Sequence, residues 1–173
     1  KNCTYKWDTY LLNSELFLSC PIKFTVIRNP FDLLKSYFLS RWGDWDGGMK
    51  TKLPRNNFKE LIIDYCNPSI KWHVPLMKKF LYHQLFDDNG NSQCDYAIIY
   101  DNLKEGLLEL FKKTDNNYKF SNKIKNKSST KNYKEYYDDE MINMVNKKCK
   151  NELEMFNFDF NGSKGTNYLI LNI

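Results

Sequence analysis

The chain has 173 residues, a net charge of +5 and a composition that is 42% hydrophobic and 16% aromatic. A chain this rich in apolar and aromatic residues is not intrinsically disordered, and its length suits a single domain with a substantial core. Its basic residues are spread along the sequence, which favours an anionic ligand in general and does not single out nucleic acid. No apolar run is long enough to span a bilayer, so we expect no transmembrane segment.

Residues 1–21 are the first segment and the hardest to interpret. Their tyrosine, tryptophan and leucine residues fit an amphipathic helix that lacks a clear capping residue. The segment starts without an initiator Met and without a signal-peptide pattern. We therefore expect the chain to be a piece of a longer protein.

A strand–turn–helix junction follows. An apolar, β-branched run predicts a buried strand that ends at Arg28, after which Asn29 can cap a helix that begins at Pro30. The unpaired N–H groups and the dipole of such a helix favour an anion. Arg28 can offer a bidentate fork to a phosphate, and Ser36 can add a hydroxyl donor. The same spacing allows a simpler arrangement, in which Arg28 pairs with Asp32 or another surface carboxylate.

The middle of the chain repeats the alternation of strand and helix. Glycines and tryptophans mark a loop at 41–49, and Asn57 then opens a helix that ends before Pro68. Residues 96–100 form a second buried-type strand, and Asn102 opens another helix with a capping-box sequence. This order predicts an α/β domain with a parallel sheet flanked by helices and a ligand crevice at the carboxyl ends of its strands.

The last third begins with a Lys- and Asn-rich stretch at 114–134, which we interpret as a long loop, either functional or simply solvated. Asp138 opens the last clear helix, and residues 161–173 are left as a C-terminal tail. The apolar face of that helix comprises Met141, Val145, Cys149, Leu153 and Phe156.

The five cysteines are widely separated and odd in number, and none lies at zinc-ligand spacing with a histidine. We therefore expect buried free thiols and no metal site.

Several segments together resemble a known family. Residues 24–32, followed by Ser36 and Tyr37, resemble the segment of PAPS-dependent sulfotransferases that grips the 3′-phosphate of the sulfate donor, 3′-phosphoadenosine 5′-phosphosulfate. The likeness is to the carbohydrate, or Golgi-type, branch. Further matches follow in the family's order and extend to residue 160. They are His73-Val74-Pro75, Asp95-Tyr96, Asp101-Asn102-Leu103 and the closing Asn157-Phe158-Asp159-Phe160, where Asn157 stands in place of the family's Gly.

The resemblance implies a sulfotransferase-like, P-loop-related fold that transfers a sulfuryl group from PAPS to a hydroxyl acceptor, expected to be a carbohydrate, without a metal. The resemblance also implies that Arg28 and Ser36 bind the 3′-phosphate. The family's Asn-x-Ser segment maps onto Asn126 and Ser128, with Lys127 between them, as further nucleotide contacts. The resemblance implies that the protein is located in the Golgi lumen if it follows the eukaryotic carbohydrate branch, and in the cytoplasm otherwise.

One part of the family pattern is missing. Residues 1–21 contain no Pro-Lys-x-Gly-Thr-like turn, the family's 5′-phosphosulfate loop, so the predicted domain is incomplete at its N-terminus. Residues 163–166 have some of the right residue types but lie at the wrong end of the chain. His73 is the best candidate for a base or a substrate contact, because imidazole takes a proton near neutral pH, although a structural histidine is the alternative.

Three functions remain open at this point. One is an active sulfotransferase, and the second is a non-catalytic module of the same fold that binds a nucleotide or an anionic glycan. The third, single-stranded nucleic-acid binding, predicts a steep loss of affinity with salt and no preference for a 3′-phosphate. The diffuse charge does not favour this third function.

Overall fold

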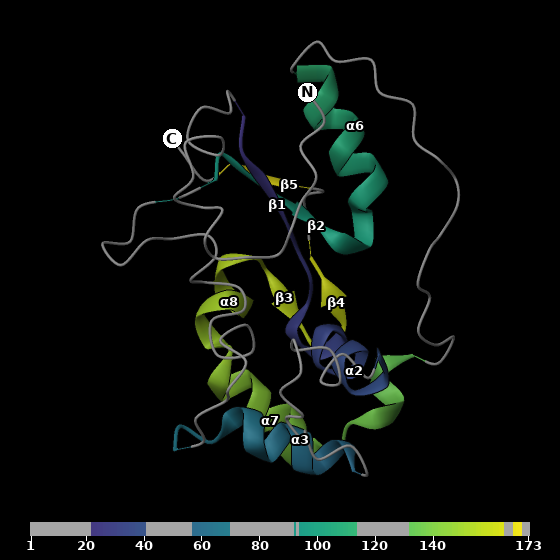
Figure 1. The fold of residues 1–173 in the computed structure, drawn as a ribbon, viewed down its shortest axis with the longest axis vertical. Helices are drawn as coiled ribbons and strands as arrows, with labels where there is room; N and C mark the ends of the chain where they lie inside the picture. Colours follow the sequence, from purple (N-terminus) through teal and green to yellow (C-terminus); the bar gives the residue numbers. More distant parts are fainter. Residues whose placement is uncertain are drawn as a thin grey trace, which may run out of the picture.

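The structure, a computed structural model, describes residues 22–40, 57–69, 92, 94–113, 132–164 and 168–170. These residues form a mixed α/β arrangement in which helices flank a small sheet (Figure 1). None of the helices in these ranges is both long enough and apolar enough to cross a membrane.

The sheet has three strands among the described residues, with β2 (Tyr96–Ile99) in the centre. Strand β1 (Phe24–Ile27) pairs in parallel with β2, and the register places Phe24 opposite Tyr96 and Ile27 opposite Ile99. On the other side of β2 lies the antiparallel strand β5 (Tyr168–Ile170), so the strand order is β1-β2-β5. The predicted parallel pair is confirmed. The third strand falls within the stretch expected to be a tail, so the sheet is mixed and not purely parallel.

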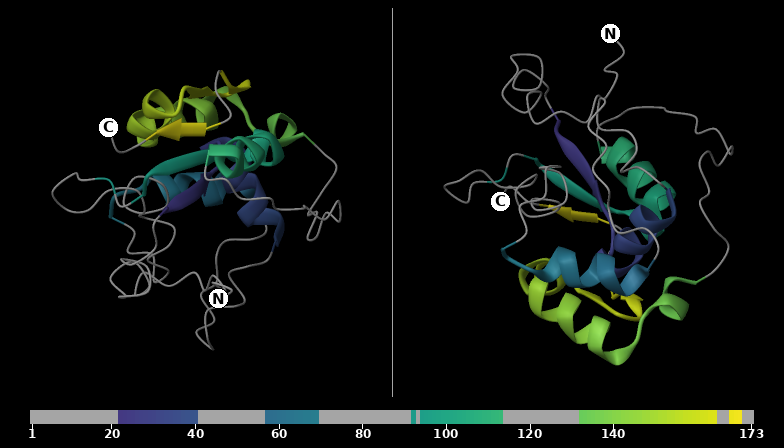
Figure 2. Two further views of the ribbon diagram at one scale, coloured as in Figure 1. Left: turned by 90° about the horizontal axis from the view of Figure 1, so that it is seen from above. Right: turned by 60° about the horizontal axis from the view of Figure 1, so that its bottom comes forward.

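The helices α2, α3, α6 and α7 follow the predicted order along the chain, whereas η3, η4, β3 and β4 were not predicted. Their bounds are α2 Pro30–Ser40, α3 Phe58–Cys66, η3 Tyr100–Asn102, α6 Leu103–Lys113, η4 Tyr133–Tyr136, α7 Asp139–Lys148, α8 Lys150–Met155, β3 Phe158–Asp159 and β4 Gly162–Ser163. Helix α6 lies alongside β1 and β2, while α2, α3 and α7 gather beyond the carboxyl end of β1 (Figure 1 and Figure 2).

Asn29 caps α2 as the sequence predicts. Its Oδ1 accepts a hydrogen bond from the backbone N–H of Phe31 at 3.1 Å, and its Nδ2 donates to the backbone carbonyl of Asp159 at 2.8 Å. The Asn29 residue is only 2% exposed. A buried amide with both ends bonded fixes the start of α2 against β3, which lies 130 residues away in the chain.

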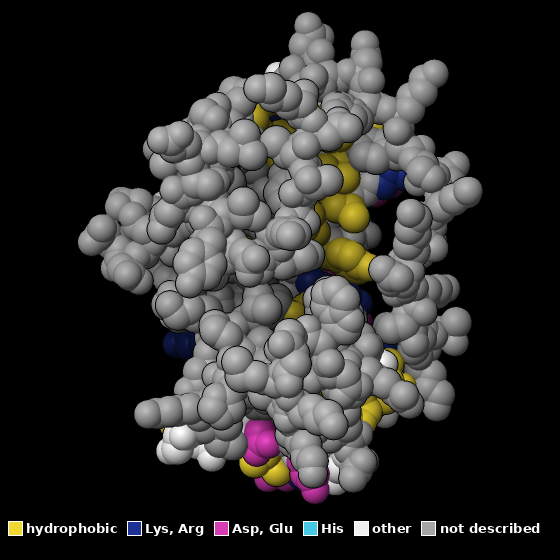
Figure 3. All heavy atoms as spheres, viewed as in Figure 1, with side chains coloured by type: hydrophobic (Ala, Val, Ile, Leu, Met, Phe, Trp, Pro, Cys, Tyr) yellow, Lys and Arg dark blue, Asp and Glu magenta, His cyan; other side chains and the backbone are white. Residues whose placement is uncertain are grey.

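Side-chain caps also begin α3 and α7. Asn57 Oδ1 accepts from the backbone N–H of Lys59 at 2.9 Å, and Asp138 Oδ1 accepts from that of Met141 at 2.8 Å. The two helix starts are joined because Lys59 Nζ contacts Asp138 Oδ2 at 3.1 Å and Glu140 Oε2 at 2.5 Å. Acidic side chains are visible at this end of the molecule in Figure 3.

The long C-terminal helix predicted from Asp138 is in fact two helices. Cys149, with φ −104° and ψ 24°, separates α7 from α8. The chain still turns helically there, since Cys149 donates to Val145 at 2.8 Å and accepts from Leu153 at 2.9 Å. As a result the predicted apolar face is unbroken and all five of its residues are buried.

Among the described residues, one hydrophobic core joins β1, β2, α2, α3, α7, α8 and β3. Its buried members are Ile27, Phe31, Leu34, Phe58, Leu61, Ile62, Ala97, Ile99, Met141, Val145, Cys149, Leu153, Phe156 and Phe158. Phe31 meets the rings of Tyr137 and Phe160 edge-on, at centroid distances of 5.3 and 5.1 Å. This packing ties the first turn of α2 to the C-terminal third of the chain.

Three of the cysteines lie in the described ranges, and all three are free thiols. Burial is the main cause that raises the pKa of Cys66 and of Cys94 to about 11, and that of Cys149 to about 12. Cys94 and Cys149 are buried, as predicted for inert thiols in a core.

Asn157, two residues after the end of α8, occupies the position where the sulfotransferase pattern has Gly. Its φ of 53° lies in the left-handed region, which asparagine tolerates better than most residues. Its Nδ2 donates to the carbonyl of Lys164, and its own carbonyl accepts from the Lys164 N–H at 2.9 Å.

We expect Asn157→Gly to change the free energy of unfolding by less than about 1 kcal/mol, because glycine adopts this conformation without strain. Asn157→Val should lower it by about 1–3 kcal/mol, because a β-branched residue is strained there. Urea unfolding of both variants measures the difference. Equal stability of the two variants would show that this backbone conformation is not required.

Candidate functional site

The candidate site begins where β1 and β2 end. Because the two strands are parallel and Ile27 is opposite Ile99, the next residues, Arg28 and Tyr100, emerge side by side at the same edge of the sheet. The central guanidinium carbon of Arg28 lies 4.4 Å from the centroid of the Tyr100 ring. At this distance the cation is attracted by the face of the ring.

Residues one and two turns into α2 complete the surroundings of Arg28. Its Nε donates to Asp32 Oδ2 at 2.5 Å, and its Nη2 lies 2.5 Å from the same oxygen. Its Nη1 donates to Ser36 Oγ at 3.2 Å. The structure therefore brings Arg28 and Ser36 together as predicted. It also forms the ion pair with Asp32, which was the simpler alternative.

The ion pair does not use all the donors of Arg28. A guanidinium has five N–H groups, and the bonds to Asp32 and Ser36 use three of them. One N–H on Nη1 and one on Nη2 have no acceptor among the residues that the structure describes. The side chain of Arg28 is 22% exposed. Arg28 can thus still donate to an anion while Asp32 holds it.

Two carboxylates, Asp32 and Asp101, lie near this guanidinium, and a third, Asp159, lies near Tyr133. Burial and the neighbouring Asp32 raise the pKa of Asp101, while Arg28 lowers it. Partial burial, followed by the charges of Asp32, Asp101 and Asp159, raises the pKa of Tyr133 to about 12. The Tyr133 hydroxyl is therefore close to carboxylates from α2, η3 and β3. The site is more acidic than the sequence alone indicated.

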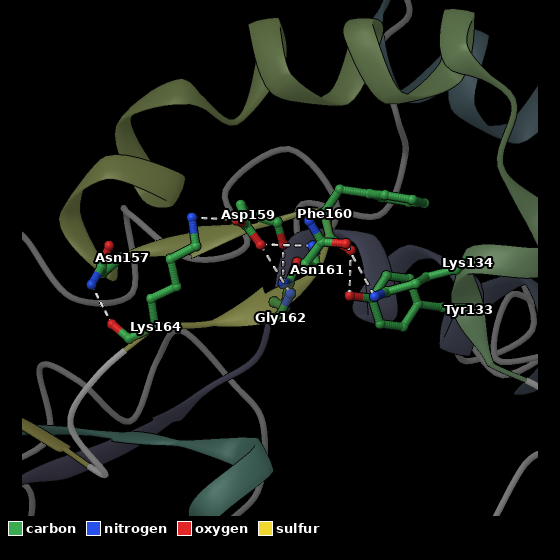
Figure 4. Close-up of polar contacts among 9 residues, drawn as sticks. Tyr133, Lys134, Asn157, Asp159, Phe160, Asn161, Gly162 and Lys164 are labelled. Carbon is green, nitrogen blue, oxygen red and sulfur yellow. Dashed lines mark hydrogen bonds and ion pairs between the residues drawn. The ribbon is translucent and has the colours of Figure 1, made fainter.

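The hairpin of β3 and β4 neutralises one of these carboxylates (Figure 4). Asp159 Oδ1 accepts from the backbone N–H groups of Asn161 at 2.7 Å and Gly162 at 3.1 Å, and its Oδ2 lies 2.6 Å from Lys164 Nζ. These contacts, with the Lys164 hydrogen bond first, lower the pKa of Asp159. Lys164 is engaged in this ion pair and Ser163 lies in β4, which is not the geometry of a phosphate loop.

The same hairpin holds η4 next to the site. Tyr133 donates its hydroxyl proton to the carbonyl of Phe160 at 2.7 Å, and Lys134 Nζ donates to Asn161 Oδ1 at 3.2 Å (Figure 4). The described end of the Lys- and Asn-rich segment, residues 132–134, therefore lies beside the site.

The other predicted site residues lie outside the described ranges. They are His73, Asn126, Lys127 and Ser128. The structure adds residues that the sequence reading did not single out. Tyr100 could have been found from the parallel register, which pairs the ends of the two strands. Lys35, on α2 next to Ser36, is only 5% exposed.

Comparisons with known proteins give no match. The chain matches no protein-family model, no curated protein and no solved structure. The case for a function therefore depends on the residues of this chain and their geometry.

Proposed function

We propose that this chain is a sulfotransferase-like domain, related to the P-loop fold, that binds PAPS and transfers its sulfuryl group to a hydroxyl acceptor of the carbohydrate class. The observation that carries the proposal is the 3.2 Å contact between Arg28 Nη1 and Ser36 Oγ at the carboxyl end of a parallel strand. A guanidinium with donors to spare, a hydroxyl and the first turn of a helix together suit a phosphate monoester.

In this proposal Arg28 and Ser36 anchor the nucleotide and do not take part in bond making. The 3′-phosphate and the transferred sulfuryl group are attached to different positions of the ribose. Binding energy from such a remote group holds the reacting atoms in line with the acceptor hydroxyl. Asn126, Lys127 and Ser128 are proposed as further nucleotide contacts, and His73 as the base that takes the acceptor's proton.

The second candidate is a non-catalytic module that binds the same nucleotide or an anionic glycan. Sulfuryl transfer, like phosphoryl transfer, needs cationic groups around the leaving phosphate. Arg28 and Ser36 bind the nucleotide in both candidates, so the module needs no group beyond those that the structure brings together.

Two measurements on the full chain separate the candidates. Calorimetry with adenosine 3′,5′-bisphosphate and with adenosine 5′-phosphate tests for recognition of the 3′-phosphate. Transfer of radiolabelled sulfate from PAPS to a panel of glycans tests for catalysis. Tighter binding of the bisphosphate together with transfer supports the enzyme, and such binding without transfer supports the module. Equal binding of both nucleotides would reject the assignment, and a steep salt dependence would then indicate nucleic-acid binding.

Asp101 provides a further prediction about this site. Its carboxylate shares the surroundings of Arg28 and Asp32, so it repels a bound phosphate. We expect Asp101→Asn to bind adenosine 3′,5′-bisphosphate about 3–10-fold more tightly at low salt, with the gain reduced as screening increases. Calorimetry at two salt concentrations measures this effect. Weaker binding by the variant would mean that Asp101 instead helps to hold Arg28 in place.

A further inference from the structure

Tyr100 is an exposed aromatic residue with an unusual neighbour. It follows β2 and is 44% exposed, although large aromatic side chains are mostly buried. One face of its ring is covered by the guanidinium of Arg28, at 4.4 Å from the ring centroid. The sequence reading gave this residue no role.

Three different contacts together restrain the Arg28 side chain. Asp32 binds the edge formed by Nε and Nη2, and Ser36 binds Nη1. Both of these contacts lie at the edge of the guanidinium, and each still allows the plane to tilt about the bonded edge. The guanidinium carbon also lies over the Tyr100 ring, 4.4 Å from its centroid. This third contact comes from another element and limits the tilt, because the attraction weakens as the cation moves away from the ring.

A restrained guanidinium binds an anion better than a mobile one. An arginine side chain has several rotatable bonds, and ordering them on binding lowers affinity. A side chain that is already held in place avoids this loss. The remaining N–H groups on Nη1 and Nη2 then point in a fixed direction before the ligand arrives.

We propose that Tyr100 is a positioning residue, which restrains the Arg28 guanidinium so that the N–H groups left unpaired by the described residues face a phosphate monoester. This inference rests on the proposed function, since it names the part of the same site that makes it selective for a 3′-phosphate. Tyr100 acts through Arg28 and not by contact with the phosphate.

The test compares Tyr100→Leu and Tyr100→Phe with the unaltered full chain. The ratio of the dissociation constants for adenosine 5′-phosphate and adenosine 3′,5′-bisphosphate measures 3′-phosphate selectivity. We expect Tyr100→Leu to lower this ratio about 5–10-fold, a loss in the range of one cation–π contact. Tyr100→Phe keeps the ring and should restore the ratio to within about twofold. Thermal unfolding checks that both variants fold.

A second readout follows the side chain directly. The Arg28 Nε–H resonance, measured by NMR without ligand, should move downfield in Tyr100→Leu, because a proton over a ring face is shielded. It should stay in place in Tyr100→Phe. A merely structural role for Tyr100 would not move selectivity and the Arg28 resonance together.

The possible outcomes are distinguishable. If the unaltered chain binds the two nucleotides equally, the proposed function fails, and the phosphate role of Tyr100 fails with it. If the unaltered chain prefers the bisphosphate and Tyr100→Leu retains that preference, the positioning role alone is overturned. If Tyr100→Leu weakens binding of both nucleotides equally, the positioning role is also overturned, because Tyr100 would then be a surface on which the adenine base stacks.

Discussion

Replacing Arg28 with Met should weaken binding of adenosine 3′,5′-bisphosphate about 100-fold while changing binding of adenosine 5′-phosphate less than about threefold. Methionine keeps most of the side-chain stem but removes every donor. Two charge-assisted hydrogen bonds to the phosphate account for the loss, at about 1.5 kcal/mol each, the lower end of the range for such bonds. Calorimetry with the two nucleotides measures both effects on the same protein.

The substitution of Arg28 also leaves Asp32 without its partner, so the carboxylate needs a control of its own. In Arg28→Met combined with Asp32→Asn, the unpaired charge is absent and the loss of bisphosphate affinity should persist. Arg28→Lys should show an intermediate loss of about tenfold, because it keeps the charge and loses the planar fork.

Lys59 offers a matched control for the loss of a cation. It lies on α3, paired with Asp138 and Glu140 and not with Arg28 or Ser36. Lys59→Met should therefore leave the preference for the 3′-phosphate intact. If Arg28→Met and Lys59→Met weaken binding equally, the attraction is due to overall charge, and Arg28 is not a specific ligand.

The features that the sequence predicted well are local ones. Asn29, Asn57 and Asp138 each cap the helix that follows, because a cap needs only a side-chain oxygen within three residues of its donor. Both strands were also predictable, since a short apolar run bounded by polar residues is typical of a strand. The prediction of burial holds for most of β2 but not for β1, where Ile27 is buried and Val26 is 39% exposed. Arg28 and Ser36 meet because both positions lie on the same side of one helix start.

The features that were missed depend on partners far away in the chain. Strand β5 forms by pairing with β2. A three-residue apolar run is too short to predict a strand unless its pairing partner is known. The break at Cys149 is not marked by Gly or Pro, and the apolar spacing continues through it. Local pattern therefore gave one helix where the tertiary structure has two.

The electrostatics of the site could not be foreseen for the same reason. Asp32 was visible as a possible partner for Arg28, since it is four residues away. Asp101 and Asp159 reach the same region only through the sheet register and through the bond between Asn29 and the Asp159 carbonyl. The sequence thus indicated a cationic site, whereas the folded chain pairs this guanidinium with Asp32 and brings Asp101 near both.

The largest effect on stability is expected from Phe31, which is fully buried in the first turn of α2. Its ring packs edge-on against Tyr137 and Phe160, and its carbonyl accepts a hydrogen bond from the Tyr137 hydroxyl at 2.9 Å. Phe31→Ala should lower the free energy of unfolding by about 3–5 kcal/mol, since it removes a buried ring and leaves a cavity among rigid aromatic neighbours. Urea unfolding monitored by circular dichroism measures this loss.

Phe31→Leu is the matched variant, because it keeps an apolar side chain of intermediate size and should cost about half as much as alanine. The packing of Phe31 also places the residues on either side of it, Asn29 at the cap and Asp32 beside Arg28. At a temperature where all variants are folded, the bisphosphate preference should therefore be retained in Phe31→Leu and weakened in Phe31→Ala. A stability loss below about 1 kcal/mol in Phe31→Ala would contradict a rigid core behind the site. The geometry around Arg28 would then need another support.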